Sequence, residues 1–411
     1  MRDGISFGSG RFLIQHGEAK GNGTMRNTFL PFTRPSITEA EIREVSDALR
    51  SGWITSGPRV AAFEKEFSAY VSARFGIAVT SATAGFHILL QALGIGPGHE
   101  VITPSLTWPS PVNMVEFVGA RPVFADIDRQ TFQLDPASVE QVLTPRTKAI
   151  LPVHFSGQPC DLDPFRALCK KHDLILIEDA AHAIGTEYRE KRIGSGKNPA
   201  VFSFHAIKNL TTGEGGLVAV SDEKLRDRLI SLRFHGVNQD AWKRYAREAA
   251  KGYDLLEPGW KYNLTDLQAA VGLAQLRRIE EMNARRAKLA DLYDHLLDGI
   301  PEILRPARVP YPSRHSWHLY TILIDPQRTR FTRDEFREEM RKRNIGTGLH
   351  FLAVHELSFY RERYRPAPEL LRNSEYVAAR IVSLPLFPDM EEDDVTEVVG
   401  EIRDVLYTRR H

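Results

Sequence analysis

A lysine and an aspartate, each placed directly after an apolar segment, are the residues of this sequence best suited to chemistry. Lys208 lies in the run FSFHAIKN at residues 202–209, with the glycine-rich run GEGG behind it, and Asp179 ends the run LILIED at residues 174–179. A lysine amine can form a Schiff base with an aldehyde, and a carboxylate can keep a pyridine nitrogen protonated. The pair therefore suits an enzyme that uses pyridoxal phosphate (PLP), whereas Lys208 taken alone is read as a solvated surface lysine.

A turn with two hydroxyl groups offers a place for an anion. Residues 77–80 predict a short strand and residues 84–93 predict a buried helix, and Ser81, Ala82 and Thr83 lie between them. The first N–H groups of a helix lack partners within the helix, so a strand-to-helix turn of this kind can bind an anion. The alternative is that Ser81 only caps the helix.

Apolar strands and helix-like segments alternate through the middle of the chain. Strands are predicted at residues 100–104, 122–127, 149–155, 174–178, 200–204 and 216–220, and helices at 109–118, 136–143, 163–172 and 222–234. Several strands are apolar throughout, which predicts an α/β domain whose mainly parallel sheet is covered on both faces. Ligands gather at the carboxyl ends of such strands. Asp179, Ser203, Lys208 and residues 81–83 all follow strand ends, so we expect them to share one edge of the sheet.

Further helices and a second domain flank this α/β unit. Thr38 and Glu41 predict a capping box for a helix that ends at Ser51 and Gly52, and residues 59–72 predict another helix. Residues 264–297 predict a long helix; the loop GWKYN at 259–263 is interpreted as its cap, and a contact across a subunit boundary is the alternative. We divide the chain into a disordered extension (1–28), a large domain with the long helix (29–298) and a small α+β domain (299–411). For the extension, an upstream start that precedes Met25 is the alternative. The small domain has a predicted strand at 317–324 and helices at 332–343, 373–381 and 392–406.

Composition and imperfect motifs argue against several other classes of protein. The 411 residues carry 54 Lys and Arg against 53 Asp and Glu, so no basic field indicates a nucleic-acid partner. Two cysteines form no disulfide framework, which favours a cytoplasmic protein, and no apolar run is long enough to span a membrane. No residue cluster predicts a metal site, since His315 and His318 fit packing better. The run GSGKN at residues 194–198 is close to a phosphate loop, but Lys191 and Asn198 replace two of its required residues.

Three runs, IEDAAH at 177–182, SFHAIKN at 203–209 and GEGG at 213–216, resemble the signature of the DegT/DnrJ/EryC1/StrS sugar aminotransferases. The resemblance extends from about Phe29 to the C-terminus and includes SGWIT at 51–55, TPSLTW at 103–108, YNLTD at 262–266, GTGLHF at 346–351 and SLPLFPDM at 383–390. The longer runs are most similar to members that make UDP-4-amino-4-deoxy-L-arabinose for lipid A modification. The resemblance implies fold type I of the PLP-dependent transferases, the fold of aspartate aminotransferase.

The resemblance also implies a role for each residue of the site. Lys208 would bind PLP as a Schiff base and shuttle a proton, and Asp179 would pair with the pyridine nitrogen. Trp108, otherwise read as a core aromatic, would stack on the cofactor ring. The other contacts would come from Ala82, Thr83 and Ser203 at the phosphate, from His182 near the ring hydroxyl, where many relatives carry Gln, and from Asn263 of the neighbouring subunit in a homodimer.

We therefore expect a PLP-dependent aminotransferase that moves an amino group from glutamate, released as 2-oxoglutarate, to a 4-keto sugar nucleotide. UDP-4-keto-pentose is the expected acceptor, and roles in lipid A and lipopolysaccharide biosynthesis and in antibiotic resistance follow from its product. Another UDP- or dTDP-keto-hexose is the alternative acceptor. A PLP-dependent sugar dehydratase is disfavoured because dehydratase relatives carry His where this chain has Lys208, and a non-catalytic relative is the other alternative.

Overall fold

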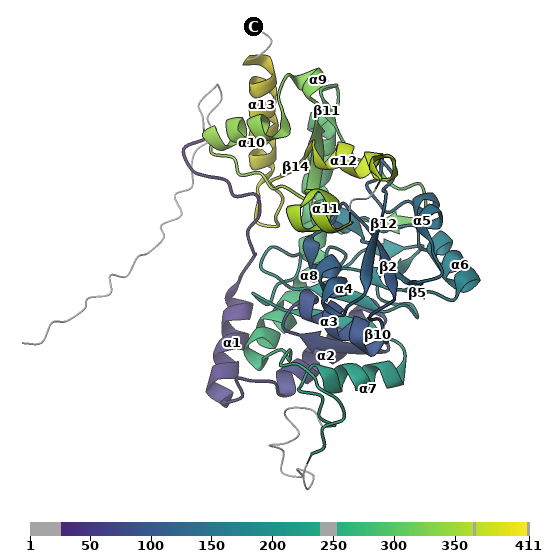
Figure 1. Cartoon of the computed structure of the whole chain (residues 1–411). Helices are drawn as coiled ribbons and strands as arrows, with labels where there is room; N and C mark the ends of the chain where they lie inside the picture. Colours follow the sequence, from purple (N-terminus) through teal and green to yellow (C-terminus); the bar gives the residue numbers. More distant parts are fainter. Residues whose placement is uncertain (1–25, 239–252, 365–366, 409–411) are drawn as a thin grey trace, which may run out of the picture.

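The structure, a computed structural model of the chain, describes residues 26–238, 253–364 and 367–408 (Figure 1). Residues 1–25 of the predicted N-terminal extension lie outside this part. Arg26 forms ion pairs with Asp394 at 2.7 Å and with Glu397 at 2.6 Å, and its carbonyl oxygen accepts a hydrogen bond from Asn344 Nδ2 at 2.7 Å. These contacts attach Arg26 to the C-terminal part of the chain.

The central sheet runs through two groups of strands that share one segment. One group has the order β3-β2-β4-β5 and the other has the order β1-β10-β9-β6. Only Ile177 separates β5 from β6, and the N–H of Asp179 donates to the carbonyl oxygen of Pro152 at 2.9 Å, so residues 175–179 join both groups. Neighbouring strands are parallel except β10, which runs antiparallel to β1 and β9, and the predicted mainly parallel sheet is confirmed. The strands are β1 (Phe75–Val79), β2 (Glu100–Pro104), β3 (Arg121–Ala125), β4 (Thr147–Ile150), β5 (Ile175–Leu176), β6 (Glu178–Asp179), β9 (Ala200–Ser203) and β10 (Gly216–Val220).

Helices cover both faces of this sheet, which explains why a strand such as β10 is apolar throughout. In β10, Val218 and Val220 pack in the core cluster with α3, α4 and α7, whereas Leu217 and Ala219 pack in the cluster with α2, α6 and α8. The predicted strand at 149–155 is shorter, because the chain leaves β4 and turns into a 3₁₀ helix (Phe155–Gly157). The helices are α2 (Pro58–Val71), α3 (Ala82–Ala92), α4 (Pro109–Phe117), α5 (Pro136–Val142), α6 (Leu162–His172), α7 (Glu223–Leu232) and α8 (Asp266–Leu297).

Capping boxes begin the first helix and the long helix. Thr38 and Glu41 form the predicted box at α1 (Glu39–Ser51), and Thr265 forms another with the side chain of Gln268 at α8. The interpretation of the loop 259–263 as the cap of α8 is therefore wrong, because Thr265 already supplies the acceptor. The loop lies against β1 instead, where the carbonyl oxygen of Tyr262 accepts from the N–H of Thr80 at 2.8 Å.

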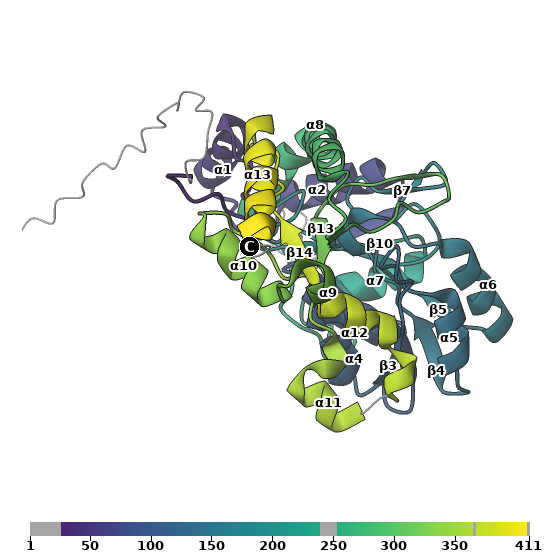
Figure 2. The same ribbon diagram turned by 90° about the horizontal axis from the view of Figure 1, so that it is seen from above.

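A second core fills the C-terminal part, where α10 and α13 pack on a small antiparallel sheet of order β11-β13-β14 (Figure 2). Tyr293 and Leu297 of α8 belong to this core as well. The predicted strand at 317–324 begins only at Tyr320, because Trp317 has a φ of 51°, in the left-handed region. The predicted helix at 373–381 ends at Ala378, and β14 follows. The strands are β11 (Ile303–Leu304), β13 (Tyr320–Ile324) and β14 (Ile381–Leu384); the helices are α9 (Pro326–Thr329), α10 (Arg333–Lys342), α11 (Ser358–Tyr364), α12 (Arg372–Ala378) and α13 (Glu392–Thr408).

Short elements that the sequence did not predict complete the described chain. A three-stranded sheet of order β12-β7-β8 consists of β7 (Glu187–Tyr188), β8 (Lys191–Arg192) and β12 (Ser313–Arg314). Two 3₁₀ helices, Val354–Glu356 and Pro368–Leu370, flank α11. Among the helices of the described residues, none combines the length and the apolar character that crossing a membrane requires. The division of the chain at residue 298 stays a prediction.

Candidate active site

The carboxyl ends of β1, β6 and β9 lie at one edge of the sheet, and most of the predicted site residues gather there. β6 and β9 are parallel, and the two antiparallel pairings through β10 make β1 parallel to β9 as well. Asp179 and Ser203 end β6 and β9, and residues 81–83 follow β1. A cavity of about 540 Å³ is lined by all of the predicted site residues except Asn263, namely Ala82, Thr83, Trp108, Asp179, His182, Ser203 and Lys208.

Burial shifts the pKa values of Asp179 and Lys208 toward each other inside this cavity. Asp179 is 5% exposed, and its burial raises the pKa of the carboxyl to about 6, while a hydrogen bond from the N–H of Ala181 at 2.9 Å and the charge of Lys208 lower it. Desolvation lowers the pKa of the partly buried Lys208 to about 8, and the charge of Asp179 raises it. The surface-lysine interpretation is therefore wrong, and the amine is ready to act as a nucleophile and proton carrier near neutral pH.

The turn before α3 both caps the helix and lines the cavity. Ser81 Oγ accepts a hydrogen bond from the N–H of Ala84 at 3.0 Å, so its capping role is confirmed. Ala82 and Thr83 are the first residues of α3, where N–H groups have no acceptor within the helix, and both line the cavity. Gly216 approaches this turn so closely that a Cβ there would lie 2.5 Å from the nitrogen of Ala82. The turn can therefore bind a phosphate through its N–H groups.

Trp108 stands at the mouth of the cavity and not in the core. It is 62% exposed and occupies the N-cap position of α4. Its ring centroid lies 6.0 Å from that of Phe351 at an interplanar angle of 49°. The core interpretation is therefore wrong, and the exposed ring can stack on a planar ligand.

His182 is neutral and carries its proton on Nε2. It is 6% exposed, and this burial, aided by the charge of Lys208, lowers the pKa of the ring well below its ordinary value. The N–H of Ser156 donates to Nδ1 at 3.3 Å, so the other ring nitrogen holds the proton. The ring stacks on Phe351 at a centroid distance of 5.8 Å and an angle of 22°. His182 can therefore donate a hydrogen bond from Nε2 to a ligand in the cavity.

His318, whose ring centroid lies 4.3 Å from that of His182, has an unprotonated Nε2. Asn209 Nδ2 donates to Asn283 Oδ1 at 2.8 Å and to the carbonyl oxygen of Ser316 at 2.7 Å. This arrangement leaves Asn209 Oδ1 to accept the proton of His318 Nδ1 at 3.2 Å. His318 Nε2 is buried and finds no hydrogen-bond partner within residues 26–238, 253–364 and 367–408. The two rings thus add no positive charge beside the cavity lysine.

Asn263 lies outside the cavity of its own chain. It is 7% exposed, its Nδ2 donates to Ser56 Oγ at 2.5 Å, and Lys261 Nζ donates to its Oδ1. An antiparallel bridge joins its backbone to Val79, the last residue of β1. Within one chain, Asn263 therefore supports the end of β1 and does not contact the cavity.

Three residues of the C-terminal part form a wall of the cavity, and sequence reasoning assigned none of them a role. Leu349, His350 and Phe351 line the cavity, and His350 Nδ1 lies 2.8 Å from Ser383 Oγ. Burial, together with the charge of Lys208, lowers the pKa of His350 to about 3. The run GTGLHF at 346–351 was the available signal, since it is one of the runs that carry the family resemblance.

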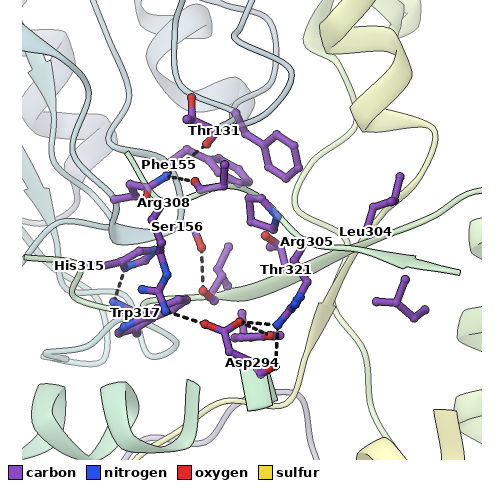
Figure 3. Close-up of a pocket in the computed structure, with 17 residues that line it drawn as sticks. Thr131, Phe155, Ser156, Asp294, Leu304, Arg305, Arg308, His315, Trp317 and Thr321 are labelled. Atoms are coloured by element: carbon purple, nitrogen blue, oxygen red, sulfur yellow. Dashed lines mark hydrogen bonds and ion pairs between the residues drawn. The ribbon is translucent and has the colours of Figure 1, made fainter. Parts of the chain in front are cut away.

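Figure 3 shows a second cavity, of about 440 Å³. Ser156, whose N–H binds the His182 ring, lines it. Figure 3 shows Arg305 and Arg308 converging on Asp294 of α8. Arg305 Nη1 donates to the Asp294 carbonyl oxygen at 2.6 Å, and Arg308 Nη2 donates to Asp294 Oδ2 at 2.7 Å. These contacts fix the segment after α8 against the long helix.

An amine of lowered pKa and a buried carboxylate at the carboxyl edge of the sheet are groups that bind PLP, and the turn before α3 can hold its phosphate. The residues present therefore fit this cofactor, on the fold of the PLP-dependent enzymes of fold type I. Residues 35–403 match the model of the DegT/DnrJ/EryC1/StrS aminotransferase family, and the chain belongs to that family.

Several solved structures share this fold along almost their whole length. A Streptococcus pneumoniae protein described as a sugar aminotransferase, Spr1654 in its PLP form, is 31% identical, with a TM-score of 0.84 over 92% of this chain and 99% of that chain. DesV of S. venezuelae is 34% identical, with a TM-score of 0.83 over 92% and 99%. DesI, solved in the presence of its TDP-sugar product, is 31% identical, with a TM-score of 0.83 over 95% and 97%. The expected fold type, cofactor and aminotransferase class are confirmed.

Proposed function

We propose that this enzyme transfers the amino group of glutamate to a 4-keto sugar nucleotide, and that UDP-4-keto-pentose is the acceptor and becomes UDP-4-amino-4-deoxy-L-arabinose. The observation that best supports amine transfer is that Lys208 and Asp179 line the same cavity. Burial there raises the pKa of Asp179 and lowers the pKa of Lys208, so the two values approach each other. A lysine at this position favours transamination over dehydration, because its amine can bind the cofactor and also carry a proton.

When bound, PLP supplies the electron sink that labilises bonds at the amine-bearing carbon. Lys208 would hold the cofactor through its amine, and the free amine would hold and release a proton near neutral pH because its pKa is about 8. Asp179 would hold the pyridine nitrogen, and a positive charge there would offset the burial of the carboxylate. The remaining contacts in this proposal are the phosphate with Ala82, Thr83 and Ser203, the ring face with Trp108, and the ring hydroxyl with His182 Nε2.

The choice of acceptor is supported by the position of the runs that resemble the arabinose-forming members. Gly348 and Ser383 exchange backbone hydrogen bonds at 2.8 and 2.9 Å, which joins the run at 346–351 to the run at 383–390. Together they bring His350 and Phe351 to the cavity wall, where an acceptor would meet them. A cytoplasmic location and a role in lipid A and lipopolysaccharide biosynthesis, with its consequence for antibiotic resistance, belong to this proposal.

A panel of acceptors tests this function. Purified holoenzyme is incubated with glutamate and, separately, UDP-4-keto-pentose and several UDP- and dTDP-4-keto-hexoses, and amino sugar and 2-oxoglutarate are measured by mass spectrometry. We expect the highest kcat/KM with UDP-4-keto-pentose and no product from Lys208→Ala. A keto-hexose turned over faster would replace the proposed acceptor. Loss of water from the sugar without amine transfer would indicate a dehydratase, and no reaction by PLP-loaded protein would indicate a non-catalytic relative.

We further propose a homodimer in which Asn263 of one chain contacts the cofactor phosphate in the other. Two observations support a role across a subunit boundary. Asn263 lies outside the cavity of its own chain, and it is anchored beside β1, the strand that leads into the phosphate turn. Reaching a partner requires the Asn263 amide to exchange its hydrogen bond with Ser56 for one with the phosphate.

Mixing two inactive variants tests whether each active site takes Asn263 from the partner chain or from its own chain. Lys208→Ala and Asn263→Ala chains are each weakly active or inactive alone, and they are co-refolded in equal amounts. A shared site gives mixed dimers in which one of two sites is intact, so about a quarter of the wild-type activity returns. Activity no greater than the mean of the two separate variants would show that Asn263 acts only within its own chain.

A further inference from the structure

A third cavity, of about 610 Å³, lies beside α6 and β5 and is distinct from the active site. It is lined by residues of α6, of β5 and β6, of the β7–β8 pair and of the loop 194–198. Glu178 lines this cavity and Asp179 lines the active site, because neighbouring residues of a strand point to opposite faces. Its volume falls within the usual range for sites that bind small molecules.

Positive charge dominates the lining of this cavity. Five cationic side chains contribute to it, against the two acids Asp163 and Glu178, and these cations are Arg166, Arg189, Lys191, Arg192 and Lys197. Asp163 is shared by Arg166 at 3.1 Å and Arg189 at 3.0 Å, so one carboxylate balances two guanidinium groups. Glu178 Oε1 already accepts a hydrogen bond from Asn198 Nδ2 at 3.0 Å. Arg192 pairs with Glu280, which lies outside the lining, at 2.9 Å, and the other four cations still outnumber the two acids. This excess of positive charge favours an anionic ligand.

The loop 194–198 leaves a small open space beside Gly196, and two hydrogen-bond donors border this space. This loop is the GSGKN run that fails as a nucleotide-binding phosphate loop. A Cβ at Gly196 would have only Arg166 Nη2 and the backbone nitrogen of Asn198 within 4 Å, each at 3.8 Å. A guanidinium group and a backbone nitrogen thus border the same small space, and Lys197 lies next to it in the chain. Guanidinium, ammonium and backbone N–H groups are the usual ligands of phosphate oxygens.

Apolar side chains form the remaining wall. Leu162, Cys169, Leu176 and Ile193 line the cavity, and each is buried in the structure. Tyr188 joins them, with the guanidinium carbon of Arg166 5.7 Å from its ring centroid. Leu174 also lines the cavity and is only half-buried. A ligand that carries an apolar group beside its phosphate would pack against this wall and cover the part of Leu174 that water still reaches.

We propose that this cavity binds a small organic phosphate, with the phosphate held at Gly196 by Arg166, Lys197 and the N–H of Asn198, and with the apolar body against the wall of α6 and β5. Binding here is separate from cofactor binding, since none of these residues lines the active-site cavity.

Calorimetry and hydrogen–deuterium exchange on the holoenzyme test this site. Phenyl phosphate and inorganic phosphate are the two probes, and exchange of the amides in residues 194–198 is followed by mass spectrometry. Gly196→Ala places a methyl group in the open space, and the backbone there does not require glycine. Lys197→Ala removes one cation of the cavity. Lys224→Ala, on the exposed face of α7 and outside the cavity, is the control with the same change in charge.

We expect both phosphates to slow exchange in residues 194–198 and phenyl phosphate to bind more tightly than inorganic phosphate. Lys197→Ala should weaken binding by roughly tenfold, the effect of losing one hydrogen bond to a charged group. Gly196→Ala should weaken binding at least as much, because its methyl group would occupy the position of the phosphate. Lys224→Ala should bind like the wild type, and all three variants should keep their aminotransferase activity. Unchanged exchange in residues 194–198, equal affinity in all four proteins or equal affinity for the two phosphates would overturn the proposal.

Discussion

Replacing Asp179 with asparagine should stabilise the apoprotein while it abolishes activity. The buried carboxyl has a pKa of about 6 in the folded chain, against an ordinary value of 3.8. At about 1.4 kcal/mol for each tenfold change in proton affinity, that difference costs about 3 kcal/mol of stability. Because the folded pKa is raised, the cost is absent below pH 3.8, grows between pH 3.8 and 6, and is fully present above pH 6.

Thermal unfolding of apoprotein at pH 8 and at pH 4 measures this cost. The asparagine oxygen still accepts the hydrogen bond from the N–H of Ala181, so the change removes the charge and keeps the contact. Unfolding 411 residues involves an entropy of about 0.9 kcal/mol/K, so Asp179→Asn should raise the Tm by about 3 °C at pH 8 and hardly at all at pH 4. In the holoenzyme the order should reverse, because the pyridine nitrogen loses its partner. A lower Tm of the variant apoprotein at pH 8, or an equal rise at both pH values, would refute the reasoning.

Three more predictions concern the same cavity. Acetylation of the Lys208 amine in the apoprotein should rise with pH through a midpoint near 8, and Asp179→Asn should lower that midpoint because it removes the charge that raises the pKa; a wild-type midpoint near 10 would contradict the shift. Gly216→Ala should weaken PLP binding by more than tenfold, since its Cβ would lie 2.5 Å from the backbone of the phosphate turn, whereas the control Gly400→Ala, with open space around it, should bind PLP like the wild type in a spectroscopic titration. Trp108→Ala should raise the Kd for PLP by roughly tenfold through loss of ring stacking, and an unchanged Kd would show that the indole does not cover the cofactor.

Local signals in the sequence predicted the elements that position the site. The box of Thr38 and Glu41 marks the start of α1, and a continuous apolar run marks β10. Because the carboxyl ends of parallel strands meet at one edge, the positions of Asp179, Ser203 and the turn after β1 were enough to place them together. Short-range chemistry and sheet geometry therefore carried this part of the prediction.

Features that depend on contacts between distant segments could not be predicted in the same way. The strands β7, β8 and β12 have two residues each, too few to show an alternation of apolar and polar positions. The protonation of His182 depends on the N–H of Ser156, and the wall at His350 depends on Ser383. The loop before α8 was wrongly interpreted as the cap of that helix. Its contact with β1 joins segments that are distant in the sequence and leaves no local pattern, whereas Thr265 and Gln268 do form a local capping pattern.

Reduction of the holoenzyme with sodium borohydride tests most directly whether Lys208 is the lysine that binds PLP. Borohydride fixes a Schiff base as a stable amine, and peptide mapping by mass spectrometry then locates the pyridoxyl group without any knowledge of the substrate. We predict one modified residue, Lys208, and no modification in Lys208→Ala. A pyridoxyl group on a different lysine of the active wild-type enzyme would contradict the assignment of this site.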